Sequence, residues 1–164
     1  MYFFPELFPL VVVVSGPRID AVELRSMSDG FETVFARQSR YAVLFVPWPG
    51  MTLPGPQERQ DLSTWANHPR VVDYTKRFCV GTAVVVHNPL FRVALSAITA
   101  FRPIHARVAP VPSVESGIEH CLGRLESEHV PLGKPAGLLQ YEVLQRVNAA
   151  MSRASRPPTV PPSG

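Results

Sequence analysis

The chain has 164 residues, of which 46% are hydrophobic and 18% are charged, and its formal net charge is +3. This length suits one domain of ordinary size, and the apolar content excludes a wholly disordered chain. The 18 prolines exclude a coiled coil or a bundle of long helices, because an interior proline breaks a helix, and two cysteines are too few for a disulfide scaffold.

The first part of the chain predicts two buried strands around one helix. Residues 10–14 (LVVVV) form a continuous apolar run, which is typical of a strand buried on both faces. We expect a helix to begin at Asp20, with Glu23 at the spacing of a capping box, and to continue to about Gln38. Residues 41–46 (YAVLFV) predict the second buried strand.

A proline-rich loop follows at residues 47–56 (PWPGMTLPGP). It carries three large apolar side chains, Trp48, Met51 and Leu53, on a segment that cannot be helix or strand. Because its prolines restrict the chain, the loop would present these side chains to a partner at a small entropic cost. The alternative is that they fold back over the edge of the sheet.

The middle of the chain predicts helix and then strand. Helical residues resume near Gln57 and run past Trp65, and His68-Pro69 interrupts them. Gly81 is predicted to cap the end of this helical region. Residues 82–86 (TAVVV) predict a third buried strand.

The remaining elements are two helices that flank a short strand, and one more helix. The first helix is expected over residues 88–101, with Pro89 in its first turn, and residues 105–109 predict an edge strand. Ser113 is the expected cap of the last core helix. A further amphipathic helix is expected over residues 136–151.

This order predicts an α/β domain, because buried strands alternate with amphipathic helices. We expect a mixed or mostly parallel sheet of four to five strands, with about four packed helices. The predicted domain spans residues 1–128. An appended C-terminal region over residues 129–151 would dock on the domain or join a partner, and residues 152–164 predict a disordered proline-rich tail.

No residue pattern predicts catalysis, a cofactor or a metal site. The chain has no glycine-rich phosphate loop, and its histidines lack ligand spacing. Cys79 and Cys121 are interpreted as small core residues. His87 is a candidate binding residue because it ends a predicted strand, where open α/β sheets bind ligands. The apolar residues 2–8 are a second candidate contact surface, under the last helix or between two copies.

Three segments give the chain a family resemblance. They are residues 16–24 (GPRIDAVEL) after the valine strand, residues 77–86 (RFCVGTAVVV) after the Trp65 helix, and residues 88–98 (NPLFRVALSAI) with the following 107–118. These segments are similar to SpoIIAA-like proteins, the STAS/Sec14-like group. The resemblance covers about residues 8–127.

The resemblance implies a small regulatory module that binds partner proteins. In the anti-sigma antagonists of this group, a serine at the start of the second helix takes a phosphate. The corresponding stretch here is residues 47–56, which contains no serine and only Thr52. The Sec14-like branch binds lipids in an apolar pocket, which implies a small apolar ligand as the alternative.

We therefore expect a non-enzymatic cytoplasmic module that acts through protein contacts, with a homodimer as one form. No signal segment, membrane span or nucleic-acid-binding tail is indicated by the sequence. No cofactor is expected. The expected interaction residues are Trp48, Met51, Thr52, Leu53 and His87.

Overall fold

A computed structural model describes residues 1–52, 54–86 and 107–154 of the chain. Its centre is one five-stranded sheet in which the strands lie in chain order. The strands are β1 (Tyr2–Phe4), β2 (Leu10–Val14), β3 (Tyr41–Val46), β4 (Cys79–Val85) and β5 (Val108–Val111). β1 pairs antiparallel with β2, and the other neighbours pair in parallel. The predicted α/β class with a mostly parallel sheet is confirmed.

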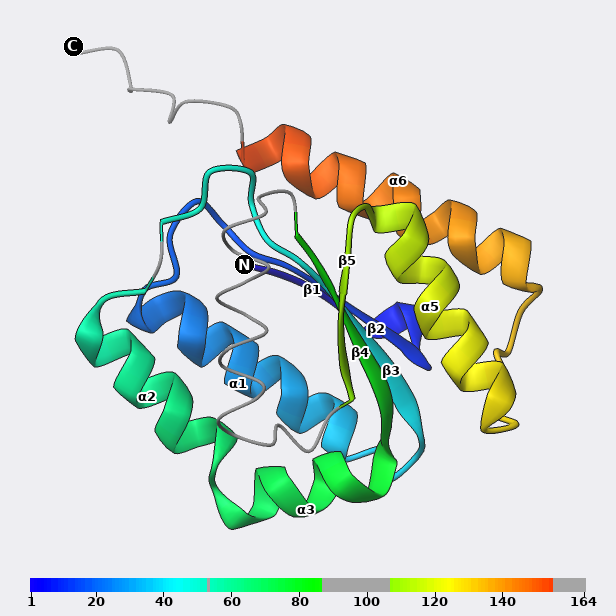
Figure 1. The fold of residues 1–164 in the computed structure, drawn as a ribbon, viewed down its shortest axis with the longest axis horizontal. Helices are drawn as coiled ribbons and strands as arrows, with labels where there is room; N and C mark the ends of the chain where they lie inside the picture. Colours follow the sequence, from blue (N-terminus) through cyan, green and yellow to red (C-terminus); the bar gives the residue numbers. More distant parts are fainter. Residues whose placement is uncertain (53, 87–106, 155–164) are drawn as a thin grey trace, which may run out of the picture.

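Helices cover both faces of the sheet (Figure 1). On one face lie α1 (Ala21–Phe35), α2 (Pro56–Ala66) and α3 (Pro69–Phe78). On the other lie α5 (Val114–Ser127) and α6 (Ala136–Ala154). A short 3-10 helix, η1 (Pro5–Leu7), joins β1 to β2. Within the described ranges no helix combines the length and the apolar character that crossing a membrane requires.

The apolar run of β2 is explained by its place in the middle of these layers. Alternate side chains of a strand point to opposite faces, and all five residues of β2 are buried. Val12 and Val14 belong to the core under α5 and α6, whereas Val11 and Val13 belong to the core under α1 and α3. A strand that is covered on both faces has no polar position.

Two predicted helix boundaries are confirmed by their capping contacts. The Asp20 side chain accepts hydrogen bonds from the backbone N–H groups of Val22 and Glu23 and so begins α1. Ser113 begins α5 with a reciprocal pair of hydrogen bonds to Ser116. Both contacts satisfy N–H groups that the first turn of a helix leaves unpaired.

The prediction that Gly81 caps a helix was wrong. α3 ends at Phe78, and β4 already begins at Cys79, so Gly81 lies inside the strand and pairs with Ala42. A Cβ atom there would lie 3.1 Å from Cγ of Arg124 on α5, so a side chain would require the arginine to move by a few tenths of an ångström. The glycine therefore marks a close approach of α5 to the sheet and not a helix end.

The edges of the sheet differ in part from the prediction. The sequence did not predict β1, in which Tyr2 and Phe4 pack against the core under α6 and Phe3 packs edge-on against Phe31. β5 is an edge strand as expected, but it extends to Val111, beyond the predicted end at residue 109. The predicted helix over residues 88–101 lies outside the described residues.

The C-terminal helix α6 packs into the same core as the sheet. Its inward stripe, Leu139, Val143, Val147 and Ala150, is buried with residues of β2, β3 and α5. Of the two arrangements that the sequence left open for this helix, docking on the domain is the one observed. The helix also runs to Ala154, three residues past its expected end.

Candidate functional site

Two loops meet where the parallel strands β2 and β3 end. The first follows β2 from Ser15 to Asp20, and the second follows β3 from Pro47 to Gly55. Thr52 of the second loop forms an isolated parallel bridge with Arg18 of the first, and its backbone N–H donates to the Pro17 carbonyl at 3.1 Å. The carboxyl edge of a parallel sheet is where α/β proteins place binding sites.

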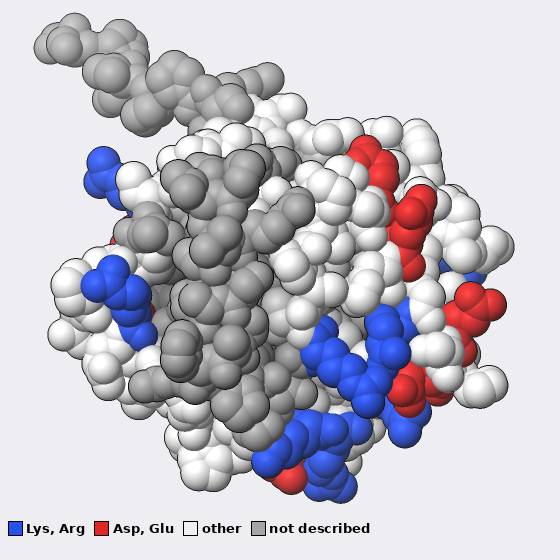
Figure 2. All heavy atoms as spheres, in the orientation of Figure 1, with Lys and Arg blue, Asp and Glu red and all other residues white. Residues whose placement is uncertain are grey.

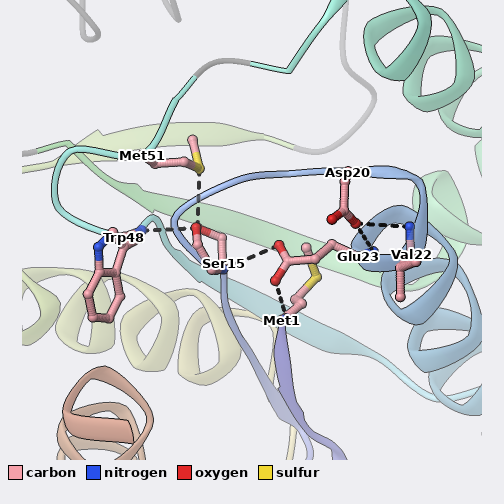
Figure 3. Close-up of polar contacts among 8 residues, drawn as sticks. Met1, Ser15, Asp20, Val22, Glu23, Trp48 and Met51 are labelled. Atoms are coloured by element: carbon pink, nitrogen blue, oxygen red, sulfur yellow. Dashed lines mark hydrogen bonds and ion pairs between the residues drawn. The ribbon is translucent and has the colours of Figure 1, made fainter. Parts of the chain in front are cut away.

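Ser15 connects the two loops from inside the protein. Its side chain is fully buried, and its Oγ accepts a hydrogen bond from the backbone N–H of Trp48 at 3.0 Å. The same hydroxyl lies 3.2 Å from Sδ of Met51 and 3.2 Å from the Gly16 carbonyl oxygen, either of which can take its proton (Figure 3). One buried hydroxyl therefore contacts both the Trp48 backbone and the Met51 side chain of the second loop.

The tip of the second loop is a tight turn whose residues follow from the turn geometry. The Met51 N–H donates to the Trp48 carbonyl at 3.0 Å, and Gly50 has a φ of +76°. A type II turn has a positive φ at its third position, which favours glycine, and proline suits its second position. Pro49 and Gly50 occupy these positions, so the turn that presents Trp48 is rigid.

Glu23 supports the first loop from α1. Its carboxylate accepts a hydrogen bond from the Gly16 N–H at 3.3 Å and also contacts the Met1 amine. A Cβ atom at Gly16 would lie 2.5 Å from Oε1 of Glu23, so a side chain at this position would displace the Glu23 carboxylate. Glu23 thus braces the chain just after Ser15, although its spacing from Asp20 had predicted a capping box.

A shallow apolar groove adjoins the second loop. Its volume is about 500 Å³, within the usual range of ~300–1,000 Å³ for ligand pockets. Its lining comes from the end of β3, the turn after it, the start of α5 and the last turns of α6: Val46, Trp48, Pro49, Val114, Val147, Asn148, Met151 and Ser152. The half-buried Trp48 ring points toward the end of α6, away from the contacts of Ser15 (Figure 3).

A group of Lys and Arg side chains lies away from this groove (Figure 2). Figure 2 shows the largest group of Lys and Arg side chains on this face below the sheet, over the end of α3. Arg40 and Arg107 directly precede β3 and β5, at the edge of the sheet where these parallel strands begin. Arg40 forms an ion pair with Glu128 at 2.9 Å. None of the described residues that line the groove is charged, so their surface suits an apolar occupant and not an anion.

The expected interaction residues do not all lie in one place. Trp48 of the second loop lines the groove, and Met51 of that loop packs against Ser15 of the first loop. Thr52 is exposed beside Pro17. Trp48 and Met51 therefore fold over the edge of the sheet, and the half-buried Trp48 ring stays partly exposed in the groove. Leu53 and His87 lie outside the described residues.

The cysteine thiols are not activated for nucleophilic chemistry. Burial raises the pKa of Cys121 to about 12, and this thiol donates to the Val43 carbonyl at 3.3 Å. Burial also raises the pKa of Cys79, against a smaller opposing effect of its hydrogen bond with Thr82. Both thiols therefore stay protonated at neutral pH, whereas the nucleophilic form of cysteine is the thiolate.

Ser15 is likewise a structural hydroxyl. A serine nucleophile needs a general base in hydrogen-bond contact. The contacts of this Oγ are instead a backbone N–H, a backbone carbonyl and a thioether. Within the described ranges no cluster of three or more His, Cys, Asp and Glu side chains is arranged to hold a metal ion.

Sequence reasoning missed part of this site. It treated Ser15 only as the residue that ends a strand, and it did not connect the groove residues of α5 and α6 with Trp48. A polar residue directly after five apolar strand residues was the available signal for Ser15. The groove had no such signal, because its lining residues are ordinary members of amphipathic helices.

Comparison with known proteins gives no relative on which to rest a function: no protein-family model matches the chain, and neither a curated protein nor a solved structure is significantly similar to it.

Proposed function

We propose that this protein is a non-enzymatic regulatory module of the SpoIIAA-like kind, which binds a protein partner at the carboxyl edge of its sheet. The observation that carries the proposal is Trp48, held by the Ser15 hydrogen bond and a proline–glycine turn, with its ring lining an apolar groove. Tryptophan on a rigid segment is favourable for protein recognition, because it contributes a large contact area and little entropy is lost on binding.

The fold supports the family part of this proposal. A SpoIIAA-like module is compatible with the α/β domain and mostly parallel sheet that the order of strands and helices predicted, and the four parallel strands follow one another in chain order. This succession does not reverse between β2 and β5, so the parallel strands lack the switch point at which doubly wound proteins bind nucleotides. A module that acts by contact fits such a sheet better than a nucleotide-dependent enzyme does.

The partner-binding proposal is tested by site-specific photocrosslinking in the native host. A photoreactive amino acid replaces the exposed Pro49 beside the groove, and the control chain carries it at the exposed Lys76 on α3. We expect one defined adduct from position 49, none from position 76, and loss of the adduct when Trp48→Ala is added. An adduct of twice the chain mass identifies a homodimer.

A matched variant tests whether the adduct depends on Trp48 in particular or on any exposed aromatic side chain. Tyr141→Ala removes an exposed aromatic side chain from the outer face of α6, and it should leave the adduct unchanged. Equal crosslinking from positions 49 and 76, or crosslinking that survives Trp48→Ala, would contradict the proposal.

The apolar lining of the groove favours a second candidate function, the binding of a small apolar ligand. Of the eight lining residues within the described part of the chain, six are apolar: Val46, Trp48, Pro49, Val114, Val147 and Met151. Native mass spectrometry of freshly purified protein should then show a bound mass that Met151→Gln, at a half-buried lining residue, removes. A chain that carries no ligand, in the unchanged protein as in the variant, would count against this candidate.

A further inference from the structure

The groove lies beside the point where the chain leaves its last helix. Met151 and Ser152 line the groove, and α6 ends two residues later at Ala154. The end of α6 therefore lies beside the groove that Trp48 lines. We propose that the groove binds a proline-rich segment in extended conformation, and that residues 157–162 of this chain are the segment that occupies it.

The composition of this segment suits an apolar groove with an aromatic wall. Residues 157–162 read PPTVPP and contain four of the 18 prolines. Proline restricts φ to about −65°, which favours the polyproline II conformation and lowers the entropy that binding removes. Proline-rich segments in this conformation bind to grooves lined by aromatic side chains.

The lining of the groove provides both kinds of contact that such a segment needs. The Trp48 ring and Pro49 form an apolar wall against which proline rings can pack. Asn148 and Ser152 are polar residues of the described lining, and their side chains can donate hydrogen bonds. A polyproline II backbone makes no internal hydrogen bonds, so its carbonyl oxygens are available as acceptors.

The length of the connection permits this contact within one chain. Only residues 155 and 156 separate the end of α6 from Pro157. Six residues of polyproline II span roughly 19 Å at ~3.1 Å per residue, enough to cross a groove of this size. A short tether gives an effective concentration on the order of millimolar, so a weak site is substantially occupied.

Occupation by the chain's own segment would regulate the site. This consequence rests on the proposed function, because a protein partner that uses Trp48 must then displace residues 157–162. The ligand class follows as well: the groove accepts proline-rich segments, and an external one competes with the internal one.

The test uses the full chain, with Trp65→Phe so that Trp48 is its single tryptophan. Acrylamide quenching is compared between this chain and one with Pro157, Pro158, Pro161 and Pro162 replaced by Ser. We expect quenching of Trp48 to rise roughly twofold when the prolines are lost, since the tethered segment is then released. Replacing the exposed Pro131 and Pro135, which precede α6, should change nothing.

A synthetic peptide of residues 155–164 is the second probe. Added in excess to the proline-free chain, it should restore the protection of Trp48, whereas the same peptide with four serines should not. If Trp65→Phe disturbs folding, 5-fluorotryptophan in the otherwise unchanged chain reports the same comparison through the ¹⁹F signal of Trp48.

Two results would overturn the proposal. One is equal quenching with and without the four prolines, together with no effect of the peptide. The other is protection that increases with protein concentration, which would assign the occupant to a second copy. If photocrosslinking from position 49 still depends on Trp48 in either case, the partner-binding function stands although this inference fails.

Discussion

The hydroxyl of Ser15 is the contact whose removal most directly tests how the site is built. Ser15→Ala keeps the size and burial of the side chain but removes the acceptor of the Trp48 N–H. It also removes the contact of Oγ with Met51. The strands below the loop are untouched, so the substitution acts on the junction between the two loops.

The cost of this substitution follows from the unpaired donor. A buried N–H group left without an acceptor costs about 1–3 kcal/mol, more than the net value of one exposed hydrogen bond. We expect Ser15→Ala to lower the free energy of unfolding by about 2 kcal/mol. For a chain of this length that corresponds to a fall in Tm of roughly 4–8 °C.

Urea denaturation with fluorescence detection measures the change, and Ser39→Ala is the matched control. The Ser39 hydroxyl also donates a hydrogen bond, to the Arg37 carbonyl at 3.1 Å, but it is exposed. Water replaces that contact, so its loss should cost less than ~0.5 kcal/mol. If both substitutions have the same small effect, Ser15 does not hold the loop and the reasoning about the site is refuted.

Four further predictions concern packing and the Cys121 thiol. Gly117→Ala should destabilise by about 1–3 kcal/mol in urea denaturation, because its Cβ would lie 2.5 Å from a leucine of β3, whereas Gly123→Ala on the open side of α5 should stabilise. Leu139→Ala should cost about 2–5 kcal/mol and Leu138→Ala under ~0.5, since their side chains are 0% and 48% exposed; equal effects would mean that α6 is not part of the core. Burial raises the pKa of Cys121 to about 12, so the thiol loses its proton at a lower pH in the unfolded chain than in the folded protein. The contribution of this thiol to the free energy of unfolding should therefore fall as the pH rises from about 8.5 toward 12. In the native protein at pH 8, a thiol reagent should label this cysteine only as fast as the chain unfolds.

The elements that could be predicted from the sequence are those whose signals are local. Continuous apolar runs predicted β2 and β3, and caps at Asp20 and Ser113 predicted two helix starts, because each signal lies within a few residues of its effect. β1 lacked such a signal. Three aromatic and apolar residues next to prolines become a strand only because β2 offers an unpaired edge and α6 covers one of their faces.

Gly81 shows how a local rule gives the wrong result. A glycine after an amphipathic stretch is a common helix end. Here, however, the determining contact is Arg124, which is 43 positions further along the chain and whose Nε donates to the Val80 carbonyl at 3.0 Å. No local pattern contains that approach of α5 to β4, so the boundary could not be placed from neighbouring residues.

The candidate site also depends on contacts between segments that are far apart in the sequence. Trp48 was singled out because a large apolar side chain on a proline-rich loop is unusual, and that signal is local. Its position depends on a serine 33 residues earlier, and its groove depends on helix α6, about 100 residues later. Because the proposed binding surface needs all three segments, a change in any one of them should alter it without altering the loop sequence. Loss of binding in Ser15→Ala or Met151→Gln, with Trp48 still in place, would therefore be a stronger sign of this surface than loss in Trp48→Ala alone.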